Sequence, residues 1–158
     1  MLANEKKFNH IKIHTQYSIC EGAIKIDDLA EFCKANKIKS IGLADSYNLC
    51  GALEFSEKLS KVGTHPIIGT QINFRFQDYI SKLPLFATSE KGFKNLSRLS
   101  SKSYLEIKPN ESPHCLFYDL LDHNDDVIVL SGGVRDFFGG LFKLNKLKLP
   151  FFRKIESV

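Results

Sequence analysis

Residues 10–18, His-Ile-Lys-Ile-His-Thr-Gln-Tyr-Ser, constrain the fold of this chain more than any other stretch. Two isoleucines alternate with His10, Lys12 and His14, so a strand would place the isoleucines on one face and the three basic residues on the other. A polar Thr-Gln-Tyr-Ser sequence follows directly. Strands of α/β proteins that end in polar residues above the sheet commonly carry the functional groups. The pattern therefore predicts an α/β fold with functional side chains at this strand end.

The rest of the chain alternates between helix-like and strand-like segments. Apolar residues at helical spacing predict helices over about 25–36, 50–62, 88–104 and 116–122. In the second of these, Leu53, Leu59 and Val62 are expected to face inward. Short apolar runs predict strands over about 8–14, 38–44, 66–74, 83–87 and 127–131. This alternation favours a parallel sheet with helices outside it.

Polar residues lie at the ends of several of these strands. His14 ends the first, Asp45 follows the second, Gln71 lies in the third, and Ser-Gly-Gly at 131–133 ends the last. Because the carboxyl ends of parallel strands meet at one edge of a sheet, His14, Asp45 and Gln71 are expected to face one another, with Lys12 among them. The 131–133 segment is expected to form a tight turn in preference to a phosphate cradle.

The composition is that of a globular protein of one domain. No apolar run approaches the roughly 20 residues of a membrane helix, and the N-terminus lacks the apolar core of a signal peptide. The four cysteines show no metal-binding spacing and indicate reduced thiols in a cytoplasm. The net charge of +4 permits a polyanionic partner without requiring one.

Five short motifs resemble, in order, those of the PHP (polymerase and histidinol phosphatase) domain. They lie within 12–22, 43–55, 66–71, 85–105 and 129–141. Within that superfamily they are most similar to the alpha-subunit family of bacterial DNA polymerase III. Each motif alone is weak, but five in the same order, covering nearly the whole chain, make a specific resemblance.

The resemblance implies a distorted (β/α)7 TIM-like barrel, incomplete in this chain. Active members of the family bind two or three divalent metals at the strand ends and hydrolyse phosphoesters. Where the family's first motif is His-x-His, this chain has Lys12 and His14; where the second is Asp-His, it has Asp45 and Ser46. The third motif supplies a glutamate, and here the residue is Gln71. Three ligands are therefore replaced.

These replacements predict a metal site that no longer functions. Lys12 brings a positive charge where a metal ion would lie, which costs roughly 4 kcal/mol per unit of like charge at about 4 Å and an effective dielectric of about 20. Gln71 lacks a negative charge, and Ser46 is a poor ligand. We therefore expect a Lys12–Asp45 ion pair, with His14 hydrogen-bonded nearby, no catalytic residue and no cofactor.

Two alternatives stay open at this stage. One is an active metal-dependent phosphoesterase or 3'-5' exonuclease that holds zinc or manganese through His14 and Asp45. The other, ranked lower, is a nucleic-acid-binding module without catalysis, because aromatic residues are not interleaved with a basic face.

The resemblance also implies a setting for residues 1–158, as the N-terminal part of the PHP domain of a longer replicative subunit. In the family such domains support the polymerase core and bind the proofreading exonuclease subunit and other replicase subunits, and the polymerase domains contact DNA. The protein is expected to be cytoplasmic, with no membrane partner. The basic, amphipathic segment 141–154 is expected to pack as a helix under a further part of the barrel, although contact with nucleic acid or a membrane surface is an alternative.

Several other polar residues are expected to be unremarkable surface groups. His65, His114 and His123 fall in loop-like stretches, and Glu54 lies beside the apolar stripe of its helix.

Overall fold

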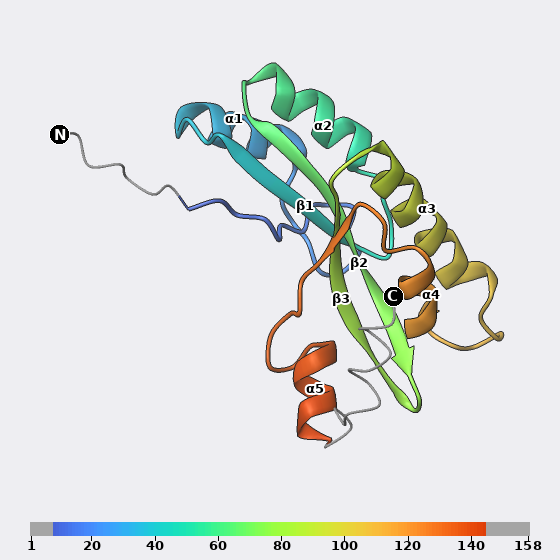
Figure 1. The fold of residues 1–158 in the computed structure, drawn as a ribbon. Coiled ribbons are helices and arrows are strands. Elements are labelled where there is room, and N and C mark those ends of the chain that lie inside the picture. The colour runs from blue at the N-terminus through green and yellow to red at the C-terminus, as the bar shows by residue number, and fades with distance from the viewer. Residues whose placement is uncertain (1–7, 145–158) are drawn as a thin grey trace.

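The computed structural model of the protein describes residues 8–144, which form a twisted sheet with helices packed along it (Figure 1). The predicted helices are confirmed, with small shifts in their bounds. In chain order the elements are α1 (Ile26–Ala35), β1 (Ser40–Ser46), α2 (Ala52–Lys61), β2 (His65–Phe76), β3 (Tyr79–Ala87), α3 (Glu90–Leu105), β4 (Cys115–Leu116), α4 (Phe117–Asp122), β5 (Val127–Val129) and α5 (Phe137–Lys143).

The sheet is mixed, with strand order β1-β2-β3-β5 and the short β4 paired with β2. β1 and β2 are parallel, whereas β3 runs antiparallel to both β2 and β5. The prediction of an all-parallel sheet is therefore wrong at β3. The reason is that β2 and β3 extend further than predicted and pair up to Phe76 and Tyr79, and so short a connection can join only antiparallel strands.

The predicted strand over 8–14 is also corrected. These residues run beside β1, but only Ile13 forms a bridge, to Leu43. The backbone of Gly42 bonds His10 O at 2.8 Å and Ile13 N at 3.2 Å, which leaves one residue more between these two contacts than a regular parallel ladder allows. Such an extra residue breaks the regular alternation of side chains, so the three basic residues of 10–14 do not share one face.

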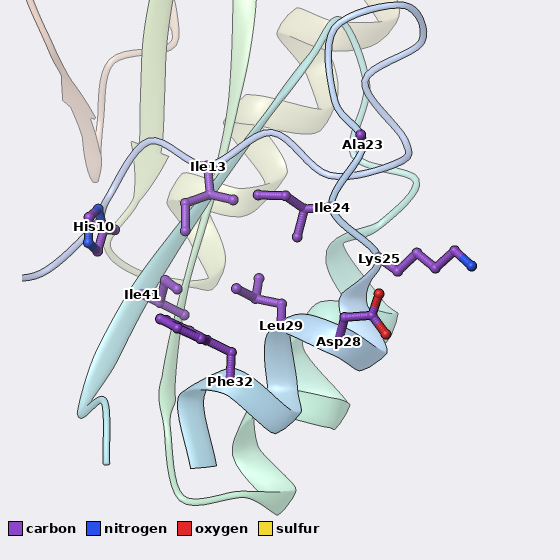
Figure 2. A pocket seen from close by; sticks show the side chains of 9 residues that line it. All are labelled: His10, Ile13, Ala23, Ile24, Lys25, Asp28, Leu29, Phe32 and Ile41. Atoms are coloured by element: carbon purple, nitrogen blue, oxygen red, sulfur yellow. The ribbon is translucent and has the colours of Figure 1, made fainter. Parts of the chain in front are cut away.

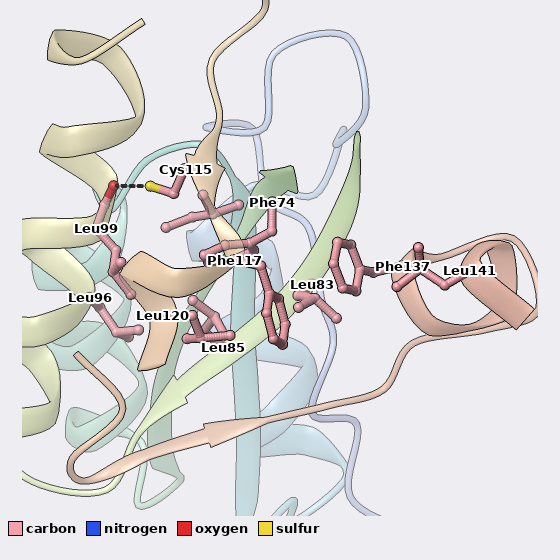
Figure 3. Packing of buried hydrophobic residues seen from close by; sticks show 11 residues of the cluster. Phe74, Leu83, Leu85, Leu96, Leu99, Cys115, Phe117, Leu120, Phe137 and Leu141 are labelled. Atoms are coloured by element: carbon pink, nitrogen blue, oxygen red, sulfur yellow. Dashed lines mark hydrogen bonds between the residues drawn. The ribbon is translucent and has the colours of Figure 1, made fainter. Parts of the chain in front are cut away.

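Two apolar clusters hold the helices to the sheet. One lies between β1 and helices α1 and α2, and includes Ile41, Leu43, Phe55 and Leu59. Phe55 is fully buried in it, whereas Leu53, expected to face inward, is 72% exposed. The other cluster joins β2 and β3 to α3, α4 and α5 (Figure 3); it contains Ile72, Phe74, Leu83, Leu85, Leu96, Leu99, Cys115, Phe117, Leu120, Phe137 and Leu141.

The observed architecture confirms an α/β fold but not a closed barrel. Across residues 8–144 the strands form an open path with β1 and β5 at its ends. The β1-α2-β2 unit is a parallel crossover of the kind that barrels repeat, and α2 and α3 lie along the same face of the sheet (Figure 1).

Most of the basic segment 141–154 lies outside the described residues, and only its beginning is seen, in α5. None of the helices within 8–144 is long and apolar enough to cross a membrane.

The packing of α3 generates a stability prediction. Leu99 is fully buried on this helix and Leu105, near its end, is 81% exposed. Leu99→Ala should lower the free energy of unfolding by about 2–5 kcal/mol, because it removes buried methyl groups and leaves a cavity. Leu105→Ala should change it by less than about 0.5 kcal/mol. Urea denaturation followed by circular dichroism measures both; equal losses would contradict the described face of α3.

Candidate polar site at the ends of β1 and β2

A polar cluster lies where β1 ends, between the loop 15–24 and β3. We define it as His14, Ser18, Glu21, Asp45, Ser46 and Lys82. In the β1–β2 register Ser46 is opposite Gln71 and Asp45 is opposite Thr70, so Asp45 and Gln71 lie at one edge of the sheet as predicted. The side chain of Gln71 shares a face with Ser46, and the expectation that it faces Asp45 is corrected. Gln71 is buried there and carries no charge.

Asp45 is the centre of the cluster and is fully buried. One carboxylate oxygen accepts hydrogen bonds from the backbone N–H of Thr15 at 2.6 Å and from Ser18 Oγ at 2.7 Å. The other accepts a hydrogen bond from Thr15 Oγ1 at 2.7 Å. The carboxylate thus accepts hydrogen bonds from hydroxyl and amide donors of the loop that follows residue 14, and no lysine between residues 8 and 144 forms an ion pair with it.

The expected Lys12–Asp45 ion pair is therefore wrong. Lys12 is exposed, and no ion pair of its side chain is found among residues 8–144. The irregular pairing at Gly42 is the physical reason, because it interrupts the alternation that would have turned Lys12 toward Asp45.

A different lysine enters the cluster from β3. Lys82 forms an ion pair with Glu21, and its Nζ lies 3.4 Å from Ser46 Oγ and 5.0 Å from the centre of the Tyr47 ring. Ser46 donates its own hydroxyl hydrogen to the second oxygen of Glu21. The Lys82 and Ser46 contacts both favour the charged carboxylate, so they lower the pKa of Glu21 below its usual value.

His14 lies at the side of the cluster, half-buried. Its Nδ1 is 3.2 Å from Ser18 Oγ, so the expected hydrogen bond of His14 is to a serine. Burial lowers the pKa of His14 below its ordinary value. The negative charge of Glu21 opposes this shift, and the positive charge of Lys12 adds to it.

Comparison with known proteins identifies the family of this arrangement. A family model described as "PHP domain" matches residues 10–153. The chain belongs to the PHP domain family.

Curated relatives of this PHP domain are replication proteins. The DNA polymerase III subunit alpha of Haemophilus influenzae is 31% identical over 137 residues, which cover 85% of this chain and 12% of the relative. That of Caulobacter vibrioides is 34% identical over 152 residues, which cover 91% of this chain and 13% of the relative. The chain therefore spans only a small part of the length of these relatives. A solved structure of an amidohydrolase from Chromobacterium violaceum, with bound sulfate and no metal, shares the fold with a TM-score of 0.50 at 13% identity, over 60% of this chain and 32% of that one.

The polar cluster has few side chains that are available as metal ligands. Across 8–144, no three His, Cys, Asp or Glu side chains are grouped so that they could hold a metal ion. Asp45 directs both carboxylate oxygens to donors of its own loop, and the Lys82 ammonium group is paired with the other carboxylate of the cluster. A divalent ion would meet a fixed positive charge in this PHP domain.

Glu21 and Lys82 are site residues that sequence reasoning missed. Lys82 is opposite Asn73 in the β2–β3 register. Recognising the tight connection after Phe76 would have fixed that register and shown that Lys82 returns to the same edge as Gln71. Without that register, the sequence pattern indicates only that Lys82 is an exposed residue of a separate strand.

Two other expectations about polar residues are corrected. Glu54 is not simply solvated, because it accepts a hydrogen bond from the Tyr17 hydroxyl at 2.6 Å and pairs with Lys58 at 2.7 Å. His114 is buried, and its Nδ1 lies 2.8 Å from the carbonyl oxygen of Ser112. The tight turn predicted over 131–133 lies further along the chain, over 133–136, where the N–H of Gly133 donates to the Asp136 carboxylate and the N–H of Asp136 donates back to Gly133 O.

The pocket next to α1 has fewer polar groups than the cluster. A pocket of about 490 Å³ lies between α1 and the extended segment 10–13 (Figure 2). Its wall is formed mainly by Ile13, Ile24, Leu29, Phe32 and Ile41. Because few polar groups converge there, we place the candidate site at the polar cluster.

The burial of Asp45 generates a prediction about stability. Asp45→Asn should lower the free energy of unfolding by about 3 kcal/mol, because the amide nitrogen that replaces an acceptor faces donors in a buried site. Asp28→Asn, at an exposed position of α1, is the matched control, with an expected loss below about 1 kcal/mol. Chemical denaturation at pH 7 measures both. Equal effects would show that the donors around Asp45 do not stabilise the fold.

The Glu21 contacts generate a pH prediction. Because the pKa of Glu21 is lowered in the folded state, its contribution to stability is present above the ordinary value of 4.5 and is lost as the pH falls below it. Glu21→Gln should therefore lower stability at pH 7 and have less effect near pH 3. Urea midpoints at the two pH values test this; a variant equally destabilised at both would contradict the charged contact.

Proposed function

We propose that this chain is part of the PHP domain of a replicative DNA polymerase III alpha subunit, and that this domain supports subunit assembly and has lost phosphoester hydrolysis. The observation that carries the proposal is the state of the polar cluster: its central carboxylate accepts three hydrogen bonds from Thr15 and Ser18, and its second carboxylate is paired with Lys82.

The chemistry of the three replaced positions supports this loss. Metal-assisted hydrolysis needs ligands that offset the charge of the ion and a free coordination position for water. Ser46 donates its hydroxyl to Glu21, Gln71 is neutral, and Lys12 is a cation directed to solvent. None of the three supplies negative charge to an ion.

The polymerase setting is supported by the relatives, which carry the name DNA polymerase III subunit alpha. We propose that the domain completes a (β/α)7-type barrel with polypeptide beyond the present chain, in the cytoplasm. Within that subunit it supports the polymerase core and binds the proofreading exonuclease subunit. DNA synthesis itself belongs to the other domains of the subunit.

A hydrolysis assay tests the proposed inactivity. Incubated with a model phosphodiester and millimolar Mn²⁺ or Zn²⁺, the wild-type chain should show no turnover above that of His14→Ala, because no described group can hold and charge-balance the ion. Release of the leaving group is followed by absorbance. Metal-dependent turnover that disappears in His14→Ala would establish the active phosphoesterase or exonuclease instead.

A binding experiment tests the assembly role separately. The chain, or the full subunit that contains it, should co-elute from a gel-filtration column with the proofreading exonuclease subunit of the same replicase. An unrelated protein of similar size is the control for nonspecific association. If the full subunit retains the exonuclease after this domain is deleted, exonuclease binding belongs elsewhere.

A further inference from the structure

Lys82 occupies an unusual position for a strand lysine. It lies in β3, paired with Asn73 of β2, and its side chain is only 26% exposed. Its partner Glu21 lies 61 residues earlier in the chain, in the loop 15–24. The ammonium group thus joins a loop that follows the first extended segment to the third strand of the sheet.

The groups around Lys82 are of the kinds that bind a cation. Glu21 supplies a carboxylate, Ser46 a hydroxyl oxygen, and Tyr47 the negative face of an aromatic ring. An ammonium group has three N–H donors and no acceptor, and it is attracted to an aromatic face, so it suits all three neighbours. The same surroundings would attract any small cation if Lys82 were absent.

We infer that the Lys82 ammonium group is the structural cation of this cluster: it fixes the loop 15–24 to the sheet and excludes divalent ions from the polar cluster. This inference rests on the proposed loss of hydrolysis and assigns that loss to a particular residue. Lys12, which the sequence pattern favoured for the same role, is exposed and has no carboxylate partner among residues 8–144.

The loop that Lys82 fixes is itself compact, so one contact can hold it as a unit. The backbone N–H groups of Glu21 and Gly22 both donate to Ser18 O, at 3.0 and 2.9 Å. A side chain on Gly22 would lie 2.0 Å from Thr15 O, so the two ends of the loop are in close contact. Ser18 in turn donates to Asp45, which links the loop to β1. Loss of the Lys82 contact should therefore increase the hydrogen-exchange rates of the Glu21 and Gly22 amides.

Hydrogen exchange compares the two lysines directly. In Lys82→Met the amides of residues 20–23 should exchange about three- to tenfold faster than in the wild type, because a partly shielded charged contact has been removed. Lys12→Met removes the same charge from an exposed side chain and should leave these amides within about twofold. The amides of α3 serve as an internal check that both variants are folded. Equal effects of the two variants, or a larger effect of Lys12→Met, would overturn the assignment.

Metal affinity gives a second readout that does not depend on catalysis. The variant Ser46→His/Gln71→Glu restores the two replaced family ligands that lie at this edge of the sheet, and Mn²⁺ binding to it is measured by calorimetry with and without Lys82→Met. With Lys82 retained, binding should be at least about tenfold weaker, because like charges repel at short range. Equal affinity in the two backgrounds would show that Lys82 does not exclude the ion.

These results separate the two proposals. Turnover by the wild type would refute the proposed loss of hydrolysis whatever the exchange data show. Normal exchange in Lys82→Met, with no turnover by the wild type, would refute the role of Lys82 alone.

Discussion

The buried carboxylate of Asp45 is the interaction on which the arrangement of this edge of the sheet depends. An ionised group taken out of water must be matched by donors, or the fold would lose several kcal/mol. The donors come from Thr15 and Ser18, which belong to the loop after the extended N-terminal segment. The closure of the loop over β1 supplies these donors to the buried side chain of Asp45. That closure also sets the position of Glu21, and through it the partner of Lys82.

A carboxylate satisfied in this way is poorly suited to metal chemistry. Ligation would require Thr15 and Ser18 to give up hydrogen bonds that hold the loop in place. In this PHP domain Asp45 acts as an acceptor for donors of the loop 15–24. The proposed loss of hydrolysis therefore rests on the environment of Asp45 as well as on the replaced positions.

Local patterns in the sequence were sufficient to predict the helices and the β1-α2-β2 crossover, because the apolar stripes of α1, α2 and α3 have a clear period. They also placed Asp45 and Gln71 at one edge, since parallel pairing fixes which residues are neighbours. They could not locate Lys12 or Lys82 correctly. One depends on an extra residue opposite Gly42, and the other on the hairpin between Phe76 and Tyr79. Both are tertiary features: a shift of one residue in pairing changes the face on which a side chain lies, and no pattern of hydrophobicity reports it.

The β2–β3 hairpin determines how a positive charge reaches the polar cluster. A metal ion must be captured from solution, so the fraction of protein that holds it varies with the amount of free metal and with competing chelators. Lys82 is covalently part of β3, and the backbone ladder with β2 carries it to the cluster each time the chain folds. The effective concentration of the Lys82 ammonium group at the cluster is therefore set by the polypeptide and not by the solution. With Lys82 in its proposed role, the order of this edge of the sheet would not depend on the supply of free metal.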